Sequence, residues 1–160
     1  MNEKDIIEKF YRAFQQRDWN TMQDCYDKSV VFSDPVFPNL DGQQARAMWH
    51  MLLSAAEDLT ITFSNVRAGG TRGSCDWEAR YSFSKTGRAV HNRIHAEFEF
   101  ANGMIIRHGD TFDLTRWAGM ALGLPGKLLG WTPWMKQKIR ATASAGLARF
   151  IDTHPEYKRR

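Results

Sequence analysis

Three ionisable side chains have the type and spacing that proton transfer requires. Asp34 precedes Pro35 at the end of a short β-branched run, and His108 and Asp110 lie two positions apart in a later alternating run. Residues two apart on a strand share one face at roughly 6.6–7 Å. A carboxylate in apolar surroundings loses hydration, so its pKa rises toward the range that acid–base catalysis uses. The pattern predicts His108 with Asp110 as the proton-transfer pair and Asp34 as an auxiliary acid or base.

Each of these residues also has a purely structural interpretation. Asp34 could close an Asx turn before the proline. Asp110 could be a buried carboxylate paired with His108 or Arg46 that serves only the fold, and His108 could be a core histidine with satisfied hydrogen bonds. The sequence leaves both interpretations open.

Neither a metal nor another cofactor is expected. His91 and His95 share a strand face but stand roughly 13 Å apart, too far to share one zinc ion. The chain has no Cys-x-x-Cys motif and no helical His-x-x-x-His motif. Its two cysteines, Cys25 and Cys75, make no disulfide framework, and free buried thiols are expected.

The elements that must position these residues are helices followed by a sheet. Helical spacing over residues 3–16 predicts a first helix, Asp18 is expected to cap a short second one, and Asp41 opens a third. The second helix is expected to carry Trp19, Met22 and Tyr26, and the apolar stripe of the third to run through Ala45, Met48, Trp49 and Leu52.

A sheet follows the three helices. Four segments alternate apolar and polar residues, and short turns join them: residues 59–67, 75–84, 89–100 and 104–112. The last segment is expected to place Ile106, His108, Asp110 and Phe112 on one face. The order predicts an α+β fold in which the helices pack on one face of a curved antiparallel sheet.

The inward-facing positions are rich in aromatic side chains. Six residues are expected to contact a ligand, although at least half of them fit a core role equally well: Phe14, Trp49, Trp77, Tyr81, Asn92 and Phe112. Asn92 is of interest because a buried amide must find hydrogen-bond partners.

The chain changes character after residue 114. We expect residues 1–114 to form the main body and residues 115–160 to form a helical extension packed on it, with Thr132 capping its last helix. The extension could form a lid, a dimer interface or a membrane-bound helix with cationic residues such as Lys136 and Lys138 opposite an apolar face. A lid or a dimer interface is favoured, and no membrane association is expected.

The overall charge excludes few partners. Lys and Arg number 22 against 18 Asp and Glu, and part of the excess lies in the tail from Lys158 to Arg160, which is expected to be solvated. No basic stripe with interleaved aromatic residues is visible, so nucleic acid is not expected as a partner.

The charged first residues do not suit a signal peptide, and no apolar run approaches the roughly 20 residues of a membrane span. These features predict a cytoplasmic location.

The order of these segments resembles the SnoaL-like branch of the nuclear transport factor 2-like superfamily, with its cystatin-like cone fold, from about residue 3 to residue 117. Four pieces carry the resemblance: residues 17–19, residues 31–36, Gly42 and residues 103–113. The resemblance implies a bent sheet wrapped by helices into a cone with an internal pocket. It also implies a homodimer, formed through the outer face of the sheet or through the C-terminal extension.

Enzymes of that superfamily suggest chemistry. Asp34 is similar in position to the general base of ketosteroid isomerases, but their oxyanion-donor positions fall at Phe10 and Ala96, which cannot donate. Limonene epoxide hydrolases resemble the chain at Asp110, whereas their other catalytic Arg and Asp fall at Trp77 and Ala79.

Polyketide cyclases resemble it best, through His108 and Asp110. The resemblance therefore implies a cofactor-free isomerase, cyclase or hydrolase that acts on a small apolar carbonyl or polycyclic compound. The alternative is a non-catalytic module that binds or carries a small apolar or aromatic ligand in the same pocket.

Overall fold

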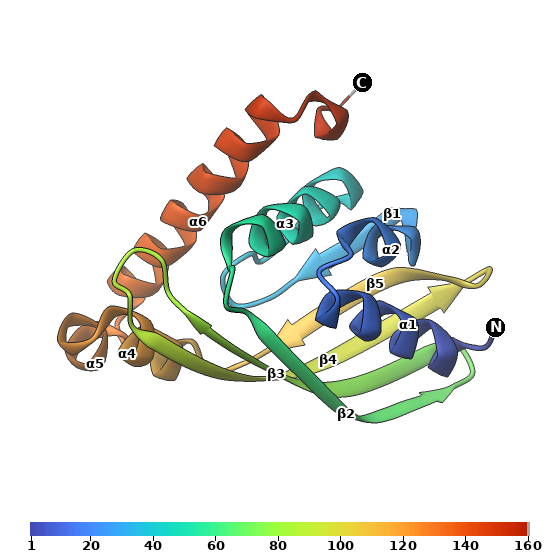
Figure 1. The fold of residues 1–160 in the computed structure, drawn as a ribbon, viewed down its shortest axis with the longest axis horizontal. Helices are drawn as coiled ribbons and strands as arrows, with labels where there is room; N and C mark the ends of the chain where they lie inside the picture. The colour runs from blue at the N-terminus through green and yellow to red at the C-terminus, as the bar shows by residue number, and fades with distance from the viewer. Residues whose placement is uncertain (160) are drawn as a thin grey trace.

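The computed structural model describes residues 1–159 (Figure 1), so the last residue of the expected solvated tail, Arg160, lies outside the described residues. Helices and strands occur in the predicted order. Their bounds are α1 Glu3–Gln15, α2 Trp19–Asp24, β1 Tyr26–Ser33, α3 Gly42–Ala55, β2 Thr60–Gly69, β3 Arg72–Ser82, β4 Ala89–Ala101, β5 Met104–Thr111, α4 Leu114–Leu122, α5 Leu124–Leu129, α6 Pro133–Thr153 and the 3₁₀ helix η1 Pro155–Tyr157.

The predicted helix caps are present. The carboxylate of Asp18 accepts the Thr21 backbone N–H at 3.1 Å, and Asp41 forms a reciprocal capping box with Gln44. The Thr132 hydroxyl accepts the Met135 backbone N–H at 3.2 Å. These side chains satisfy N–H groups that lack partners inside each helix, which explains where α2, α3 and α6 begin.

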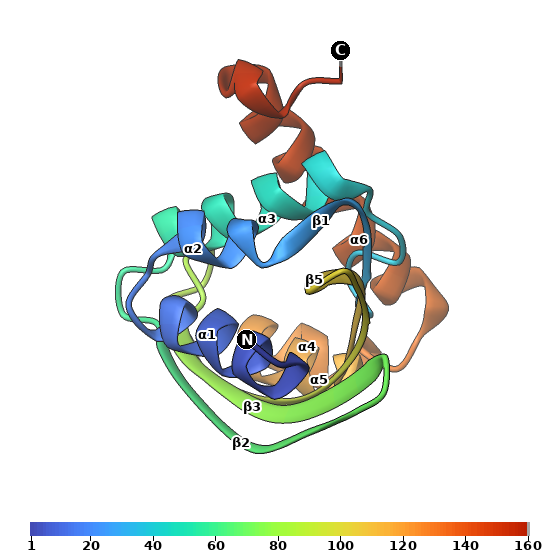
Figure 2. The ribbon, with the colours of Figure 1, turned by 90° about the vertical axis from the view of Figure 1, so that its right-hand side faces the viewer.

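The five strands form one curved, open sheet in the order β1-β5-β4-β3-β2. Strands β2 to β5 form the expected antiparallel meander, but β1 joins β5 in parallel, so the sheet is mixed. Figure 2 shows the sheet curving around α1, with α2, α3 and β1 on the opposite side. The sheet and these helices together make the α+β cone.

Three local predictions were wrong. Tyr26 is not on the second helix, because α2 ends at Asp24 and Tyr26 begins β1. Leu52 is 39% exposed, whereas Leu53 is buried, because Leu53 lies four residues after the buried Trp49 on the same side of α3. On β5 the fully buried residue is Ile105 instead of Ile106, because the register shifts between Glu99 and Phe100 of β4.

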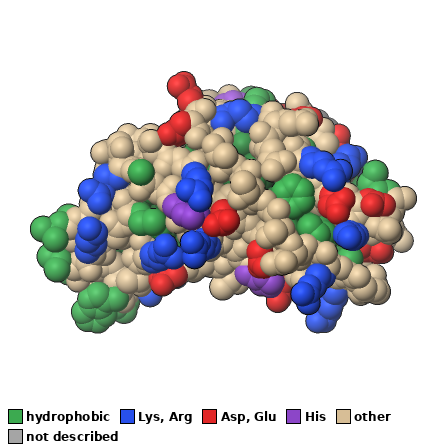
Figure 3. All heavy atoms as spheres, turned by 60° about the horizontal axis from the view of Figure 1, so that its bottom comes forward, with side chains coloured by type: hydrophobic (Ala, Val, Ile, Leu, Met, Phe, Trp, Pro, Cys, Tyr) green, Lys and Arg blue, Asp and Glu red, His purple; other side chains and the backbone are tan. Residues whose placement is uncertain are grey.

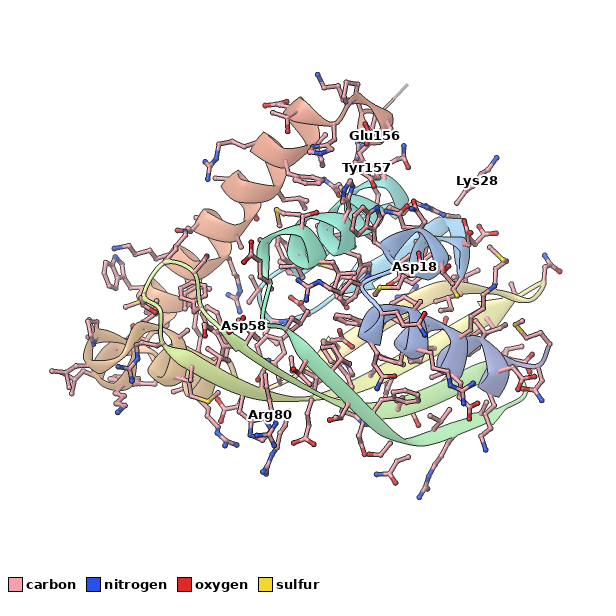
Figure 4. All side chains as sticks on the ribbon, viewed as in Figure 1. Asp18, Lys28, Asp58, Arg80, Glu156 and Tyr157 are labelled. Atoms are coloured by element: carbon pink, nitrogen blue, oxygen red, sulfur yellow. The ribbon has the colours of Figure 1, made fainter. Side chains whose placement is uncertain are left out.

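The C-terminal helices lie against the body of the molecule. Helix α4 follows β5 directly and contacts β4, while α6 packs on α3. In η1 the Tyr157 hydroxyl accepts a hydrogen bond from the Gln23 amide at 2.9 Å and lies 2.9 Å from His50 Nδ1 (Figure 4). Among residues 1–159, no helix has both the length and the apolar character that a membrane crossing requires.

Candidate functional site

The inner face of β5 carries the centre of the candidate site. His108 is fully buried and Asp110 is 6% exposed. His108 Nε2 lies 2.9 Å from Asp110 Oδ1, so the structure brings the predicted pair into direct contact. Arg46, the alternative partner for Asp110, instead donates to the backbone carbonyls of Gly42, Tyr26 and Asp27.

A line of hydrogen bonds holds the side chains of this pair in place. Trp49 Nε1 donates to the Tyr26 hydroxyl oxygen at 2.9 Å, and that hydroxyl lies 2.7 Å from His108 Nδ1. An indole N–H can only donate, so the Tyr26 oxygen accepts from Trp49 and the Tyr26 hydrogen is free to point at His108 Nδ1. When the hydroxyl donates to Nδ1, Nε2 carries the ring hydrogen and donates it to Asp110. The Trp49–Tyr26–His108–Asp110 relay therefore joins an indole, a phenol, an imidazole and a carboxyl group in one line of hydrogen bonds.

Asp110 has a second oxygen that the relay does not use. Its Oδ1 accepts from His108 and makes a longer 3.4 Å contact with Trp77 Nε1. Among the described residues, Oδ2 has no hydrogen-bond partner. It also keeps some accessible surface, because it is not among the completely buried side-chain atoms that lack a partner. The carboxyl group is thus held by one oxygen, and the other makes no hydrogen bond with a described residue.

Asp34 lies beside this pair. Phe32 and Ser33 of β1 pair in register with His108 and Gly109, which places Asp34 next to Asp110. Its Oδ1 accepts the backbone N–H groups of Val36 and Phe37 at 2.7 and 2.6 Å, which is the Asx turn that the sequence left open.

The electrostatics of Asp34 nevertheless differ from those of a surface turn residue. Burial raises its pKa from 3.8 to about 6, and the neighbouring Asp110 charge adds to the rise. The two backbone hydrogen bonds and His108 act in the opposite direction. A carboxyl with this pKa exchanges protons close to neutral pH.

Tyr11 was missed as a candidate from the sequence. It is fully buried on α1, and its hydroxyl is the one sealed side-chain polar atom without a hydrogen-bond partner among the described residues. Burial, followed by the Asp110 charge, raises its pKa well above 10. Tyr11 lies on the same buried stripe as Ile7 and Phe14, so its burial could be read from the sequence, but the lack of a partner could not.

The six expected ligand contacts divide into two groups. Phe14, Trp49 and Trp77 pack together at the relay, with the Phe14 ring 5.1 Å from Trp49 and 5.3 Å from Trp77. Tyr81 and Asn92 lie on β3 and β4 nearer to α4, where the Tyr81 hydroxyl accepts from Trp117 Nε1 at 2.8 Å.

Phe112 is half-buried directly after β5. The structure therefore brings three of the six expected contacts to the catalytic candidates and places Tyr81 and Asn92 toward the α4 end.

The outer face of the sheet is a separate region with mixed charge (Figure 3). Cross-strand pairs cover it, including His91 with Glu78 and His95 with Asp76, both at 2.7 Å. Two hollows of about 480 and 700 Å³ lie on this face. Neither is lined by His108, Asp110 or Asp34. No group of three or more His, Cys, Asp or Glu side chains in residues 1–159 is placed to hold a metal ion.

A sequence model of the SnoaL-like domain matches residues 7–108, more than half of the chain. The chain belongs to the SnoaL-like domain family. The match begins at Ile7 within α1, includes β1 to β4 and reaches His108, but it ends before Asp110 and the C-terminal helices. No curated protein matches this SnoaL-like chain.

Solved structures share the fold of this SnoaL-like domain. IdmH of Streptomyces antibioticus, a proposed polyketide cyclase, has a TM-score of 0.64 at 19% identity over 77% of this chain and 100% of its own. AclR of Streptomyces galilaeus, a proposed hydroxylase, has a TM-score of 0.62 at 16% identity, covering 79% of this chain and 96% of its own.

A protein of Catenulispora acidiphila with a ketosteroid isomerase-like fold, in complex with trimethylamine, has a TM-score of 0.66 at 13% identity, covering 80% of this chain and 97% of its own. At these identities the similarities establish the cone fold and leave the chemistry to the residues of the site.

Proposed function

We propose that this SnoaL-like domain binds a small, largely apolar carbonyl or polycyclic compound in its interior and moves a proton on it without a cofactor. The observation that carries the proposal is the Trp49–Tyr26–His108–Asp110 relay, which fixes a carboxylate by one oxygen and leaves the other free. A preorganised base in a water-poor site is what abstraction of a carbon-bound proton requires.

The roles follow from the positions and surroundings of the two carboxyl groups. Asp110 Oδ2 removes the proton from a carbon next to the substrate carbonyl, while His108 and Trp77 hold Oδ1. Asp34, with a pKa of about 6, is the group that returns a proton, since two carboxyls in different environments can divide the acid and base roles. The sealed Tyr11 hydroxyl, which has no partner among the described residues, becomes the donor for the developing negative oxygen once the surrounding rings move apart to admit the substrate.

The comparisons support the substrate class only as an analogy. IdmH is a proposed polyketide cyclase, and polyketides carry repeated carbonyl groups. The ring-lined surroundings of the relay, with Phe14, Trp49 and Trp77 in mutual contact, suit a flat apolar compound.

A second function is favoured by a different observation. Both ring nitrogens of His108 already have protein partners, and Asp34 Oδ1 is used by its own turn. A histidine with both ring nitrogens satisfied also suits a binding or carrier protein in which the relay only shapes the pocket.

Proton exchange on a small ketone separates the two functions. We expect the protein to accelerate the exchange of deuterium from heavy water into 2-tetralone, followed by NMR. The Asp110→Asn variant should lose about 10²- to 10⁴-fold of that rate while still binding the ketone. Asp76→Asn, which removes a carboxylate from the outer face, serves as the matched control.

Exchange that is unchanged in Asp110→Asn would remove Asp110 from the base role. Binding of 2-tetralone without any exchange by the unaltered protein would instead favour the carrier function.

Two assignments accompany this function. We propose a homodimer through the outer face of the sheet, because rows of opposite charges suit a self-complementary interface. Gel filtration at micromolar concentration that shows only a monomer would contradict it. The free buried thiols of Cys25 and Cys75 suit a reducing compartment, so the cytoplasm remains the proposed location, which cell fractionation tests.

A further inference from the structure

One end of the molecule exposes large apolar side chains. Helix α5 and the start of α6 leave five of them open, with exposures of 68% for Leu124, 62% for Leu128, 41% for Leu129, 66% for Trp131 and 59% for Trp134. We call these five residues the α5 patch. Helices α4 and α5 lie beyond the sheet at one end of the ribbon (Figure 1), and the surface view shows apolar side chains grouped at that end (Figure 3). An exposed cluster of this kind marks an interaction surface.

Packing of α5 on α4 keeps the patch exposed. A Cβ atom at Gly126 would overlap the Ala118 carbonyl oxygen, and a Cβ at Gly130 would lie 3.0 Å from the Ala118 Cβ. The glycine side of the helix is therefore pressed against α4, and the leucines on the other side cannot turn inward. A lid over the interior would need Trp131 and Trp134 packed inward, and both are mostly exposed.

The segment that carries the patch has charge of one sign. Residues 114–151 contain no Asp or Glu and six cations: Arg116, Lys127, Lys136, Lys138, Arg140 and Arg149. This segment is net +6, whereas the rest of the chain, with 16 Lys and Arg against 18 Asp and Glu, is net −2. Among residues 1–159, none of the six cations forms an ion pair.

A neighbouring loop adds to this charge. Arg88, at the turn between β3 and β4, donates to the Met120 carbonyl of α4 at 2.9 Å, and it too forms no ion pair within the described part of the chain. Lys138 Nζ lies 5.1 Å from the centroid of the Trp134 ring, so a cation and an aromatic ring of the patch share one surface.

We propose that the α5 patch docks on an anionic lipid membrane. Leucine and tryptophan side chains that project from a rigid element enter the interfacial layer, tryptophan favours that layer, and the surrounding lysines and arginines attract anionic headgroups. Charge decides against a second copy of this chain as the occupant, because two copies of the patch would bring Lys127, Lys136 and Lys138 of each chain together. Docking would bring the α4 end of the interior, where Trp117 meets Tyr81, toward the lipid.

Co-sedimentation of the full chain with lipid vesicles tests this proposal. We expect binding to equimolar phosphatidylglycerol and phosphatidylcholine vesicles at about 0.05 M salt to exceed binding to pure phosphatidylcholine by about tenfold or more, and to weaken at about 0.5 M salt. The double variant W131S/W134S should lose about tenfold of this partition.

Two triple variants separate the local charge from the charge of the whole protein. K127Q/K136Q/K138Q should also lose about tenfold at the lower salt concentration. K4Q/K9Q/K28Q removes the same charge from exposed positions of α1 and β1 and should stay within about twofold of the unaltered protein. All of these residues are at least partly exposed, and circular dichroism checks that each variant folds.

Three results would overturn the proposal. The first is no preference for phosphatidylglycerol vesicles at the lower salt concentration. The second is an equal loss in the K4Q/K9Q/K28Q control, which would indicate attraction without a defined surface. The third is a concentration-dependent dimer that W131S/W134S abolishes, which would assign the α5 patch to a second copy of the chain.

Discussion

Replacing Tyr26 with Phe should destabilise the fold far more than the same replacement at Tyr11. Both tyrosines are buried, both lose one hydroxyl, and both leave a ring of the same shape. The Tyr26 hydroxyl joins Trp49 Nε1 to His108 Nδ1, whereas the Tyr11 hydroxyl has no partner among the described residues. The two variants therefore differ only in the hydrogen bonds that the hydroxyl makes.

The magnitude follows from the groups that are left behind. Tyr26→Phe orphans one buried donor and one buried acceptor, and each orphaned group costs about 1–3 kcal/mol, so the free energy of unfolding should fall by about 2–6 kcal/mol. His108 cannot compensate for the lost hydrogen bond by carrying its hydrogen on Nδ1, because the lone pair of Nε2 would then face the Asp110 carboxylate. Tyr11→Phe should leave stability unchanged or raise it by up to about 1 kcal/mol, because it removes a buried group that has no partner.

Urea unfolding at neutral pH, followed by tryptophan fluorescence and by circular dichroism, measures both changes. Equal m-values would show that the difference in midpoint reflects stability. Losses that agree within about 0.5 kcal/mol for the two variants, or a Tyr26→Phe variant as stable as the unaltered protein, would refute the relay.

Two further predictions concern Asp34 and the base of α5. The folded state binds the Asp34 proton more tightly than the unfolded chain does, so this residue favours folding at low pH and loses that contribution as pH rises through about 6. The free energy of unfolding of Asp34→Asn should therefore exceed that of the unaltered protein by about 1–3 kcal/mol near pH 7.5 and match it near pH 3.5. Urea titrations at both pH values measure this difference. A difference that is the same at both pH values would contradict the prediction. Gly126→Ala should lower the free energy of unfolding by about 1–3 kcal/mol or more, because its Cβ overlaps the Ala118 carbonyl, and thermal unfolding that matches the unaltered protein would exclude this packing.

Local pattern was enough to predict most of the elements. Alternation along β3 and β4 correctly indicated which residues face inward, because a strand with one buried face must repeat every two residues. The caps at Asp18, Asp41 and Thr132 were also predictable from the local sequence, because each lies within four residues of the N–H group it satisfies.

The errors came from contacts that are distant in sequence. The parallel partner of β1 lies about 80 positions later, and nothing in residues 26–33 announces it. The spacing of Trp19, Met22 and Tyr26 is helical, yet Tyr26 is needed on a strand where its hydroxyl reaches His108. The β4–β5 register shift likewise depends on how two strands meet, so the pattern of β5 alone placed Ile106 inward.

The candidate site was also only partly predictable from the sequence. The sequence found His108 and Asp110 because they are two apart on one strand, but it did not find Tyr11 or Tyr26. Whether a buried tyrosine has a partner depends on side chains from other elements, and one sequence does not contain that information.

A crystal structure of the protein with 2-tetralone bound tests the central claim most directly. The account predicts the ketone in the interior, with its oxygen within hydrogen-bond distance of the Tyr11 hydroxyl and an adjacent carbon facing Asp110 Oδ2. Ketone bound only in the hollows of the outer face, with the interior closed by the side chains around the relay, would contradict it.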